Sequence, residues 1–382
     1  MSESESWLLQ LPDPCLLAML RCCADDPRSL FSAARAHSRL HQAAVLAASS
    51  VKAVLHQQAD SVLQYLESYG QHVSSITLEG ADDYVQDDSA GEDEDKKYTQ
   101  LHTTLVQLPH HKLQGLSSLS CRLLHLQLQP GGGFLGVLAA LSPLTQLQLD
   151  QCTLLDWEEG PAAALAQLPM LQHLDIYFSM SRSRGFLCLP SSTLPPQLTY
   201  LNLAGVHTFN AGALSGLQLL KHLFVEGVPP GGTTVFEPDA LAGKTQLQHL
   251  VVLACRIAGG SAGHMQLLAH LQIMKQLTHL DMGSTSVLGP EPSPTAQAYS
   301  ALTASSQLQY LQLREKLPPG VWQHMFPAGR QLPHLRVLNV NGVRLPTSPA
   351  PAPEGRRLVA CCPGLQELYM WGLQYSTELL AR

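Results

Sequence analysis

The chain has 382 residues, of which 45% are hydrophobic and only 14% are charged. Charged residues usually make up about 25% of a soluble domain, so Gln, His, Ser and Thr must supply much of the polar surface. The net charge of -7 gives no basic footprint for nucleic acid,, and no apolar run approaches the roughly 18 residues of a membrane span. These features exclude a nucleic-acid partner and a membrane partner from our expectations.

The N-terminal residues and the cysteines predict the compartment. Residues 2–6 contain glutamates where a secretory signal would carry cations,. The nine cysteines include two adjacent pairs and show no C-x-x-C spacing suited to zinc,. We interpret them as reduced and mostly buried, and expect a cytoplasmic and/or nuclear protein.

Residues 1–60 have a helical pattern. Apolar residues recur at spacings of three and four through Leu16, Leu17 and Leu20, and again around Leu30,. The sequence Asp26-Pro27 fits the cap and first turn of a helix that carries Leu30. We predict a small helical module.

Residues 61–122 are predicted to hold two weak strand-containing repeats, starting at residues 73 and 98. Between them, residues 81–97 contain eight acidic residues with Gly and Ser. Such a stretch repels itself and buries little apolar surface. We predict a disordered acidic insertion there.

Residues 123–373 repeat a phrase of the form Leu-x-x-Leu-x-Leu, which we number as positions one to six. It is clear in Leu144–Leu149, Leu171–Ile176 and Leu247–Val252, and it returns every 21 to 31 residues. Segments rich in Ala and Leu between the phrases favour short helices. The pattern predicts an α/β solenoid, a horseshoe with a parallel concave sheet, followed by a tail at 374–382.

This phrase resembles the leucine-rich repeat family, in which positions one, four and six face the core. Cys152 and Cys255 fall on a ninth position that is often Asn or Cys in that family. Alternate residues of a strand point to opposite faces, so positions three, five and seven should line the concave side. From these positions we select a partner-binding set: Tyr177, His222, Phe224, His249, Val251, Leu253, His279, Tyr310, Tyr369 and Trp371.

Two features of this predicted face leave alternatives open. His222, His249 and His279 should form a ladder on neighbouring strands, and we favour a hydrogen-bonding ladder over a metal site because no carboxylate or cysteine completes one. The apolar and aromatic side chains suit a binding hot spot. They are equally compatible with coverage by a loop or by the C-terminal tail.

The N-terminal segment resembles an F-box. It contains Leu11-Pro12, a leucine-rich helix, an Asp-Pro break before Leu30, and the pair Arg35 and Arg39. It departs from the F-box pattern at Cys15 and Leu40. The resemblance implies binding to the adaptor of cullin-RING ubiquitin ligases through Leu11, Pro12, Leu16, Leu17, Leu20 and Leu30. The alternative is a helical cap that seals the first repeat.

The sequence contains no G-x-S-x-G, P-loop, H-E-x-x-H or dinucleotide-binding motif. We therefore expect a non-catalytic binding subunit without a cofactor or a metal. The two resemblances together imply the substrate receptor of an SCF-type ubiquitin ligase, present as a single copy in a hetero-complex with the adaptor and a protein substrate. The alternative is an interaction scaffold or a small-GTPase regulator with no ubiquitin role.

Overall fold

The computed structural model describes residues 7–23, 26–47, 49–80, 108–127, 134–155, 165–178, 194–206, 208–209, 211–227, 234–283, 286–287, 295–313, 317–318, 320–340, 357–358, 360–370 and 373–376. The chain divides into two compact units, Met1–Gly185 and Phe186–Arg382. Within the described ranges, no helix has the length and apolar character that crossing a membrane requires.

The first unit begins with a short 3-10 turn and three helices: η1 (Trp7–Gln10), α1 (Asp13–Arg21), α2 (Pro27–Ala36) and α3 (Ser38–Ala47). The carboxylate of Asp26 accepts a hydrogen bond from the Arg28 amide and caps α2, whose first residue is Pro27,. α3 packs against both α1 and α2. The predicted helical module is therefore present, with the predicted cap.

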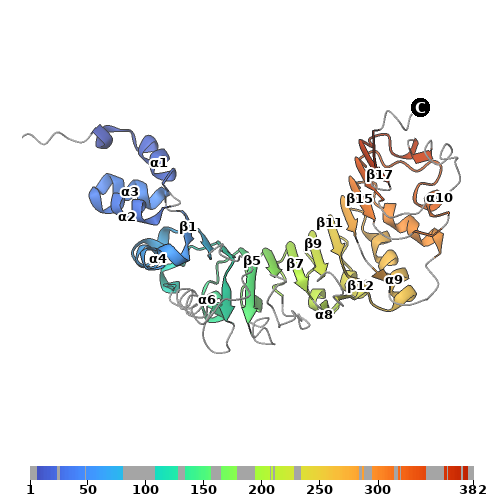
Figure 1. Ribbon diagram of the computed structural model, residues 1–382, viewed down its shortest axis with the longest axis horizontal. Coiled ribbons are helices and arrows are strands. Elements are labelled where there is room, and N and C mark those ends of the chain that lie inside the picture. Colours follow the sequence, from blue (N-terminus) through green and yellow to red (C-terminus); the bar gives the residue numbers. More distant parts are fainter. Residues whose placement is uncertain are drawn as a thin grey trace, which may run out of the picture. The chain divides into compact units, whose positions relative to one another are not determined.

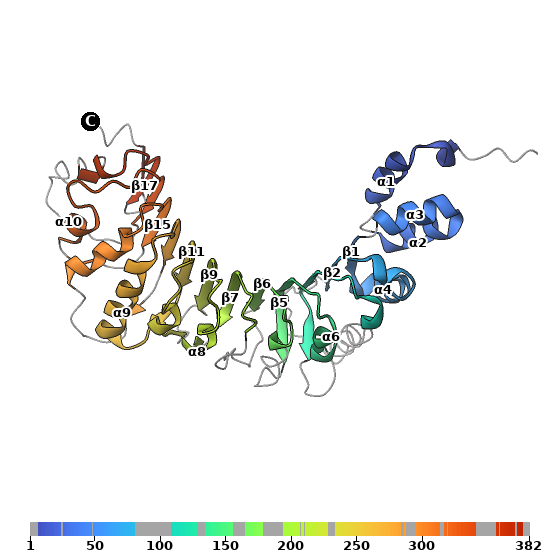
Figure 2. The ribbon, with the colours of Figure 1, turned by 180° about the vertical axis from the view of Figure 1, so that it is seen from behind.

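A parallel sheet follows in the first unit, with the strand order β1-β2-β3-β5-β6 (Figure 2). Its strands are β1 (Ser50–Val54), β2 (Ser75–Glu79), β3 (Ser118–Arg122), β5 (Gln146–Leu155) and β6 (His173–Phe178). The helical segments between them are α4 (Leu55–Tyr69), η2 (Gly70–His72), η3 (His110–Lys112) and α6 (Phe134–Ala140). Each strand is followed by a crossover, which a parallel pairing requires.

Two predictions about this region were wrong. Strand β1 lies inside the segment predicted to be helical, because Val51 and Ala53 alternate with polar residues and are buried. The phrase predicted to start at residue 123 starts at Leu116 instead, since Ser118 pairs with Ser75 on one side and with Gln146 on the other. The phrase predicted from residue 98 lies outside the described residues.

The register error has a local cause. Leu123, which follows the last residue of β3, adopts a φ of 54°, and Gln151 and Ala254 adopt a φ of 52° at the same position of their repeats. The next short strand, β4 (His125–Gln127), pairs with the distal end of β5 at Thr153–Leu155. His125 and Gln127 are thus not on the main sheet, contrary to the predicted register.

The sheet of the second unit has the order β7-β9-β11-β13-β15-β16-β17-β18. Its strands are β7 (Tyr200–Val206), β9 (His222–Gly227), β11 (His249–Leu253), β13 (His279–Met282), β15 (Tyr310–Leu313), β16 (Val337–Asn339), β17 (Glu367–Met370) and β18 (Leu373–Ser376). All described pairings are parallel except that of β17 with β18, which is antiparallel. β18 extends past the predicted boundary of the repeats into the predicted tail.

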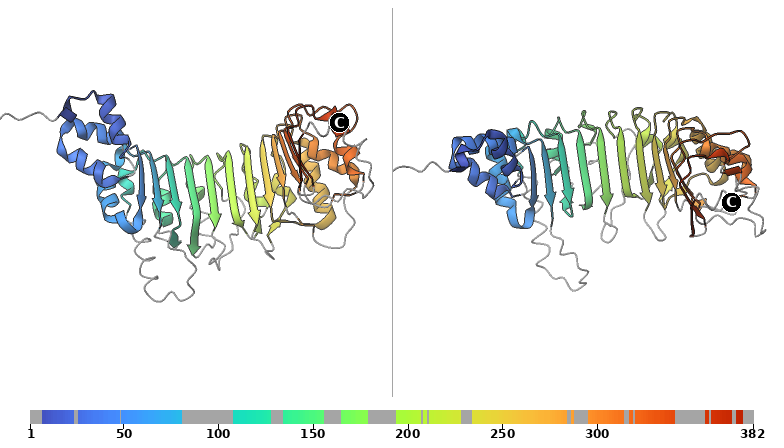
Figure 3. Two further views of the ribbon diagram at one scale, coloured as in Figure 1. Left: turned by 45° about the horizontal axis from the view of Figure 1, so that its top comes forward. Right: turned by 90° about the horizontal axis from the view of Figure 1, so that it is seen from above.

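Helical segments cover one face of this sheet, and α9 and α10 lie on the same side of its strands in Figure 1. They are α8 (Ala211–Leu214), η4 (Pro238–Leu241), α9 (Gly260–Ile273), η5 (Ala296–Thr303) and α10 (Val321–Met325). A second, smaller parallel sheet has the order β14-β12-β10-β8, formed by Ser286–Val287, Arg256–Ile257, Val235–Phe236 and Thr208–Phe209. The strands of the larger sheet of this unit lie side by side in Figure 3.

The repeat positions explain the core. Leu247, Leu250 and Val252, at positions one, four and six, are fully buried. At position two, the backbone carbonyl accepts hydrogen bonds from two successive amides of the next repeat, as Lys221 does from Gln248 and His249. The apolar interior and this backbone ladder together fix which side chains of each strand face away from the helices.

Candidate functional site

Strands β9 and β11 display the exposed face of the second sheet most clearly. Buried and half-buried residues alternate along both strands. His222, Phe224 and Glu226 share the face opposite to the core, and they pair in register with His249, Val251 and Leu253. We call these six residues the β9–β11 patch.

Position three carries a continuous stack of rings across five strands. The ring centroids of Tyr200 and His222 are 5.7 Å apart and those of His222 and His249 are 4.4 Å apart. The centroids of His249 and His279 are 5.4 Å apart, and those of His279 and Tyr310 are 4.2 Å apart. We call these residues the ring ladder: Tyr200, His222, His249, His279 and Tyr310. The predicted histidine ladder is present, and a tyrosine extends it at each end.

Two histidines of the ladder, His249 and His279, favour the neutral state. Burial lowers the pKa of His249 below its usual value of 6.5. Burial, with a contribution from the neighbouring His249, lowers the pKa of His279 to about 4. A neutral imidazole offers one hydrogen-bond donor and one acceptor, so near pH 7 these two rings offer both without a positive charge.

The geometry of the ladder suits stacking better than metal coordination. The planes of His249 and His279 are inclined by 17°, and those of His279 and Tyr310 by 4°. A metal binds a ring nitrogen in the plane of its ring, and nearly parallel planes do not aim their nitrogens at one point. In the part of the chain that is described, no group of three or more His, Cys, Asp or Glu residues could hold a metal ion.

A carboxylate lies at the edge of the apolar part of the β9–β11 patch. Phe224, Val251 and Leu253 are each half-buried on adjacent strands. Glu226 pairs in register with Leu253 on one side and with Ala204 on the other. Because burial among these neighbours disfavours the charged form, it raises the pKa of the Glu226 carboxyl,.

A partly buried hydrogen-bond network extends this face toward the C-terminus. The Gln312 side chain donates to Asp281 Oδ2 at 2.9 Å, and its Oε1 accepts from the Tyr310 hydroxyl at 2.7 Å and from Asn339 Nδ2 at 2.8 Å. The network joins β13, β15 and β16. On β17, the Tyr369 hydroxyl donates to the Glu367 carboxylate at 2.6 Å. Trp371 lies outside the described residues.

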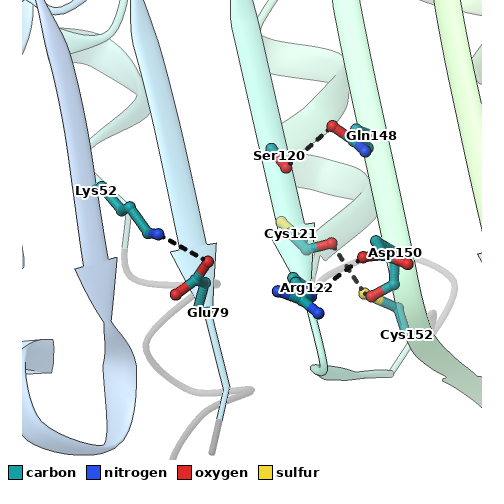
Figure 4. Close-up of polar contacts among 8 residues, drawn as sticks. All are labelled: Lys52, Glu79, Ser120, Cys121, Arg122, Gln148, Asp150 and Cys152. Atoms are coloured by element: carbon teal, nitrogen blue, oxygen red, sulfur yellow. Dashed lines mark hydrogen bonds and ion pairs between the residues drawn. The ribbon is translucent and has the colours of Figure 1, made fainter. Parts of the chain in front are cut away.

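The corresponding face of the first unit is polar instead. Lys52 Nζ lies 3.2 Å from the carboxylate of Glu79, and Arg122 Nε lies 3.2 Å from that of Asp150 (Figure 4). Ser120 donates to Gln148 at 3.4 Å on the same two strands as Arg122 and Asp150, two residues earlier. Tyr177, the predicted partner-binding residue of this unit, is 39% exposed on β6. It is thus on the surface, but no other aromatic of the predicted set lies in this unit.

The predicted adaptor-binding residues have two kinds of environment. Leu16 and Leu20 are buried inside the helical module, and they can support an interface without contacting a partner. Pro12 is exposed, and Leu11 and Leu17 are half-buried. The side chain of Leu30 lies outside those that the structure describes. Their role in adaptor binding stays a prediction.

The module also contacts the first repeat. α2 packs against β1 and α4. Arg28 of α2 donates to the Ser61 hydroxyl at 3.2 Å and to the Gln57 carbonyl at 3.1 Å, both on α4. These contacts are those expected of a cap, so the capping role and the adaptor-binding role can coexist on different faces of the module.

No protein-family model matches the sequence, and no curated protein matches it. Among solved structures, the chain is similar to TLR13 in complex with ssRNA13, with a TM-score of 0.51 and 15% identity over 87% of this chain. It spans only 41% of that TLR13 chain. A weaker similarity is with the internalin inlF of Listeria monocytogenes, with 14% identity, a TM-score of 0.44 and coverage of 83% of this chain and 89% of that one. Another is with a leucine-rich repeat protein of Leptospira interrogans, with 15% identity, a TM-score of 0.40 and coverage of 78% of this chain and 72% of that one. The fold is an α/β leucine-rich repeat solenoid.

The ninth-position cysteines are buried in this solenoid, and their thiols bond to backbone carbonyls. The Cys152 thiol donates to the Cys121 carbonyl at 3.3 Å, and the Cys255 thiol donates to the Leu253 carbonyl at 3.1 Å. Burial raises the pKa of each thiol to about 12, which keeps both protonated. The repeat register therefore identified these residues correctly.

Residues of the candidate site that the sequence analysis did not select are Tyr200, Glu226, Gln312 and Asn339. All four fall on positions three, five or seven of their repeats, so the register alone could have found them. The register could not predict which of these polar side chains form hydrogen bonds with one another and which can still bond to a partner.

Proposed function

We propose that the protein is a non-catalytic binding subunit that holds a protein partner on the exposed face of its second sheet. The observation that supports this most strongly is the ring ladder beside the apolar side chains of the β9–β11 patch. Half-buried aromatic and aliphatic side chains on a rigid sheet are the groups that dominate binding hot spots. The strands preorganise them, which reduces the ordering that binding requires.

We further propose that helices α1 to α3 attach this subunit to the adaptor of an SCF-type ubiquitin ligase. The support is the three-helix module in the order of the F-box pattern, with Pro12 exposed and Leu17 half-buried. The held protein would then be a ubiquitination substrate. The role of this chain would be proximity, because holding a substrate near the conjugating enzyme raises its effective concentration.

The alternative is a repeat scaffold or small-GTPase regulator with no ubiquitin role. The contacts of Arg28 with α4 support it, since they join the module to the first repeat, as a cap would require. Removal of residues 1–50 would not separate the two roles, because it would remove the start of β1 together with the module.

A point variant separates the two. The purified full chain and its Leu17→Asp variant are titrated against the recombinant adaptor. We expect binding by the parent chain and at least about a tenfold loss in the variant, since a charge at an apolar contact is costly, with unchanged circular dichroism. No binding by the parent chain would refute the ligase role and leave the scaffold.

A further inference from the structure

Glu226 differs from the other carboxylates that share its repeat position. Glu79 and Asp150 also lie at position seven, and each has a cation from the neighbouring strand, Lys52 and Arg122 respectively. Glu226 has no ion pair or side-chain hydrogen bond within the described residues. Its two neighbours in the sheet are Ala204 and Leu253, which cannot donate a hydrogen bond from their side chains.

The other acids on the same face of the second sheet have donors. Asp281 accepts from Gln312, and Glu367 accepts from the Tyr369 hydroxyl. Among the described residues of this face, Glu226 is therefore the carboxylate with no donor at either oxygen, and it can accept hydrogen bonds from a group outside the chain. A half-buried carboxylate between apolar neighbours gains more from a cation than a solvated one does.

The chemistry beside Glu226 specifies the rest of the ligand. Phe224 lies two residues before it on the same face of β9, and Val251 lies next to Phe224 on β11. Alternate residues of a strand are roughly 6.6 Å apart and neighbouring strands about 4.8 Å apart. A carboxylate and an apolar surface are thus within the reach of two adjacent side chains of one bound peptide.

We propose that the β9–β11 patch recognises a protein segment carrying a lysine or arginine next to an apolar side chain, and that Glu226 pairs with that cation. The apolar side chain packs on Phe224 and Val251. Burial lowers the pKa of the His249 ring, which adjoins this surface, so near pH 7 this ring is uncharged and does not repel the cation. This inference rests on the proposed function, since it names the kind of partner that the same face holds.

A nucleic acid is a poorer occupant of this patch. The ring ladder could stack with bases, as aromatic side chains do in single-strand binding proteins. Such sites add a positively charged groove for the phosphates, whereas here a carboxylate adjoins the rings. The net charge of -7 also disfavours binding of a polyanion such as a nucleic acid.

The test uses a library of random 12-residue peptides displayed on phage and selected on the immobilised full-length chain. Selected peptides are synthesised, and their affinities are measured by fluorescence anisotropy against the parent chain, Glu226→Gln, Phe224→Ala and the control Glu79→Gln. We expect peptides that place Lys or Arg beside an aliphatic or aromatic residue. Glu226→Gln should weaken binding about tenfold, as the loss of a charged hydrogen bond predicts, and Glu79→Gln should not weaken it.

A charge exchange completes the test. Glu226→Lys should bind the selected peptide poorly and should recover affinity when the basic residue of the peptide is replaced by Glu. If Phe224→Ala weakens binding while Glu226→Gln does not, the cation preference is wrong and the proposed protein-binding face stands. If neither variant changes the affinity, the patch is not the binding face and both proposals fail. A selected consensus without basic residues would also overturn the inference.

Discussion

The imidazole of His279 lies nearly parallel to the phenol of Tyr310, with ring centroids 4.2 Å apart and planes inclined by 4°. The Tyr310 hydroxyl in turn donates to Gln312, which also holds Asp281 and Asn339. Ring stacking at position three and hydrogen bonding at position five are therefore connected through one tyrosine. This connection makes the exposed face of the second sheet sensitive to protonation and to single polar substitutions.

We expect the free energy of unfolding to fall as the pH is lowered from about 6.5 toward 4. The pKa of His279 is about 4 in the folded chain against an ordinary value of 6.5. Between these values the unfolded chain binds more protons, so stability is present above pH 6.5 and is lost on acidification. The full shift corresponds to about 3 kcal/mol, and partial exposure of the ring reduces this to about 1 to 2 kcal/mol. Urea denaturation at several pH values measures it.

The variant His279→Phe is the control for this prediction. Phenylalanine keeps an aromatic ring in the stack and cannot titrate. It should flatten the dependence of stability on pH between 4 and 6.5 without abolishing it, because burial also lowers the pKa values of His173, His249 and His264. An unchanged pH dependence in His279→Phe would show that this ring does not contribute.

Gln312→Leu should destabilise the chain by about 2 to 4 kcal/mol, because it removes three hydrogen bonds, one of them to the buried Asp281,. Gln312 is only 4% exposed, and its side chain joins Asp281, Tyr310 and Asn339. The matched control is Gln309→Leu, three residues earlier at an exposed position, which should change stability by less than about 0.5 kcal/mol,. Equal effects of the two substitutions in urea denaturation would contradict the role of the network.

The repeat phrase predicted most of the fold because its buried positions depend only on local apolar spacing. Leu247, Leu250 and Val252 are buried as their positions required. The prediction failed at Leu123, where a leucine begins a second phrase one residue after the true one, Leu116–Cys121, has ended. Both phrases satisfy the spacing, and the choice depends on pairing with Ser75 and Gln146, which are distant in sequence,.

The candidate site was predicted as a set of positions but not as a set of interactions. Position three predicted the ladder of His222, His249 and His279, since neighbouring parallel strands place equal positions side by side. Whether a carboxylate forms an ion pair depends on which side chains the neighbouring repeat places within its reach. Lys52 reaches Glu79 from position five of its strand, and no single-repeat pattern contains that diagonal contact.

Arg39→Ala should loosen the segment that opens the N-terminal module. Arg39 lies 2.5 Å from the Asp13 carboxylate and donates to the Leu11 carbonyl at 3.0 Å, so it ties α3 to the start of α1. We expect faster amide hydrogen exchange over residues 11–16 and a loss of about 1 kcal/mol for this largely exposed contact. Arg21→Ala, an exposed residue at the end of α1, should leave exchange in that segment unchanged. Equal exchange in Arg39→Ala and the parent chain would refute the role of this contact.

Gly227→Ala should be among the most damaging small substitutions in the second unit. A Cβ at this position, which follows Glu226, would lie 2.3 Å from the Ala254 carbonyl oxygen and 2.8 Å from the Thr234 side chain. The backbone of β9 or of the next repeat must then shift, which we expect to cost at least about 2 kcal/mol and to displace Glu226. Gly216→Ala is the matched control, because a Cβ there meets nothing within 4 Å. It should be neutral or slightly stabilising, since alanine restricts the unfolded chain. If Gly227→Ala unfolds at the same urea concentration as Gly216→Ala, the close approach between successive repeats does not limit their stability.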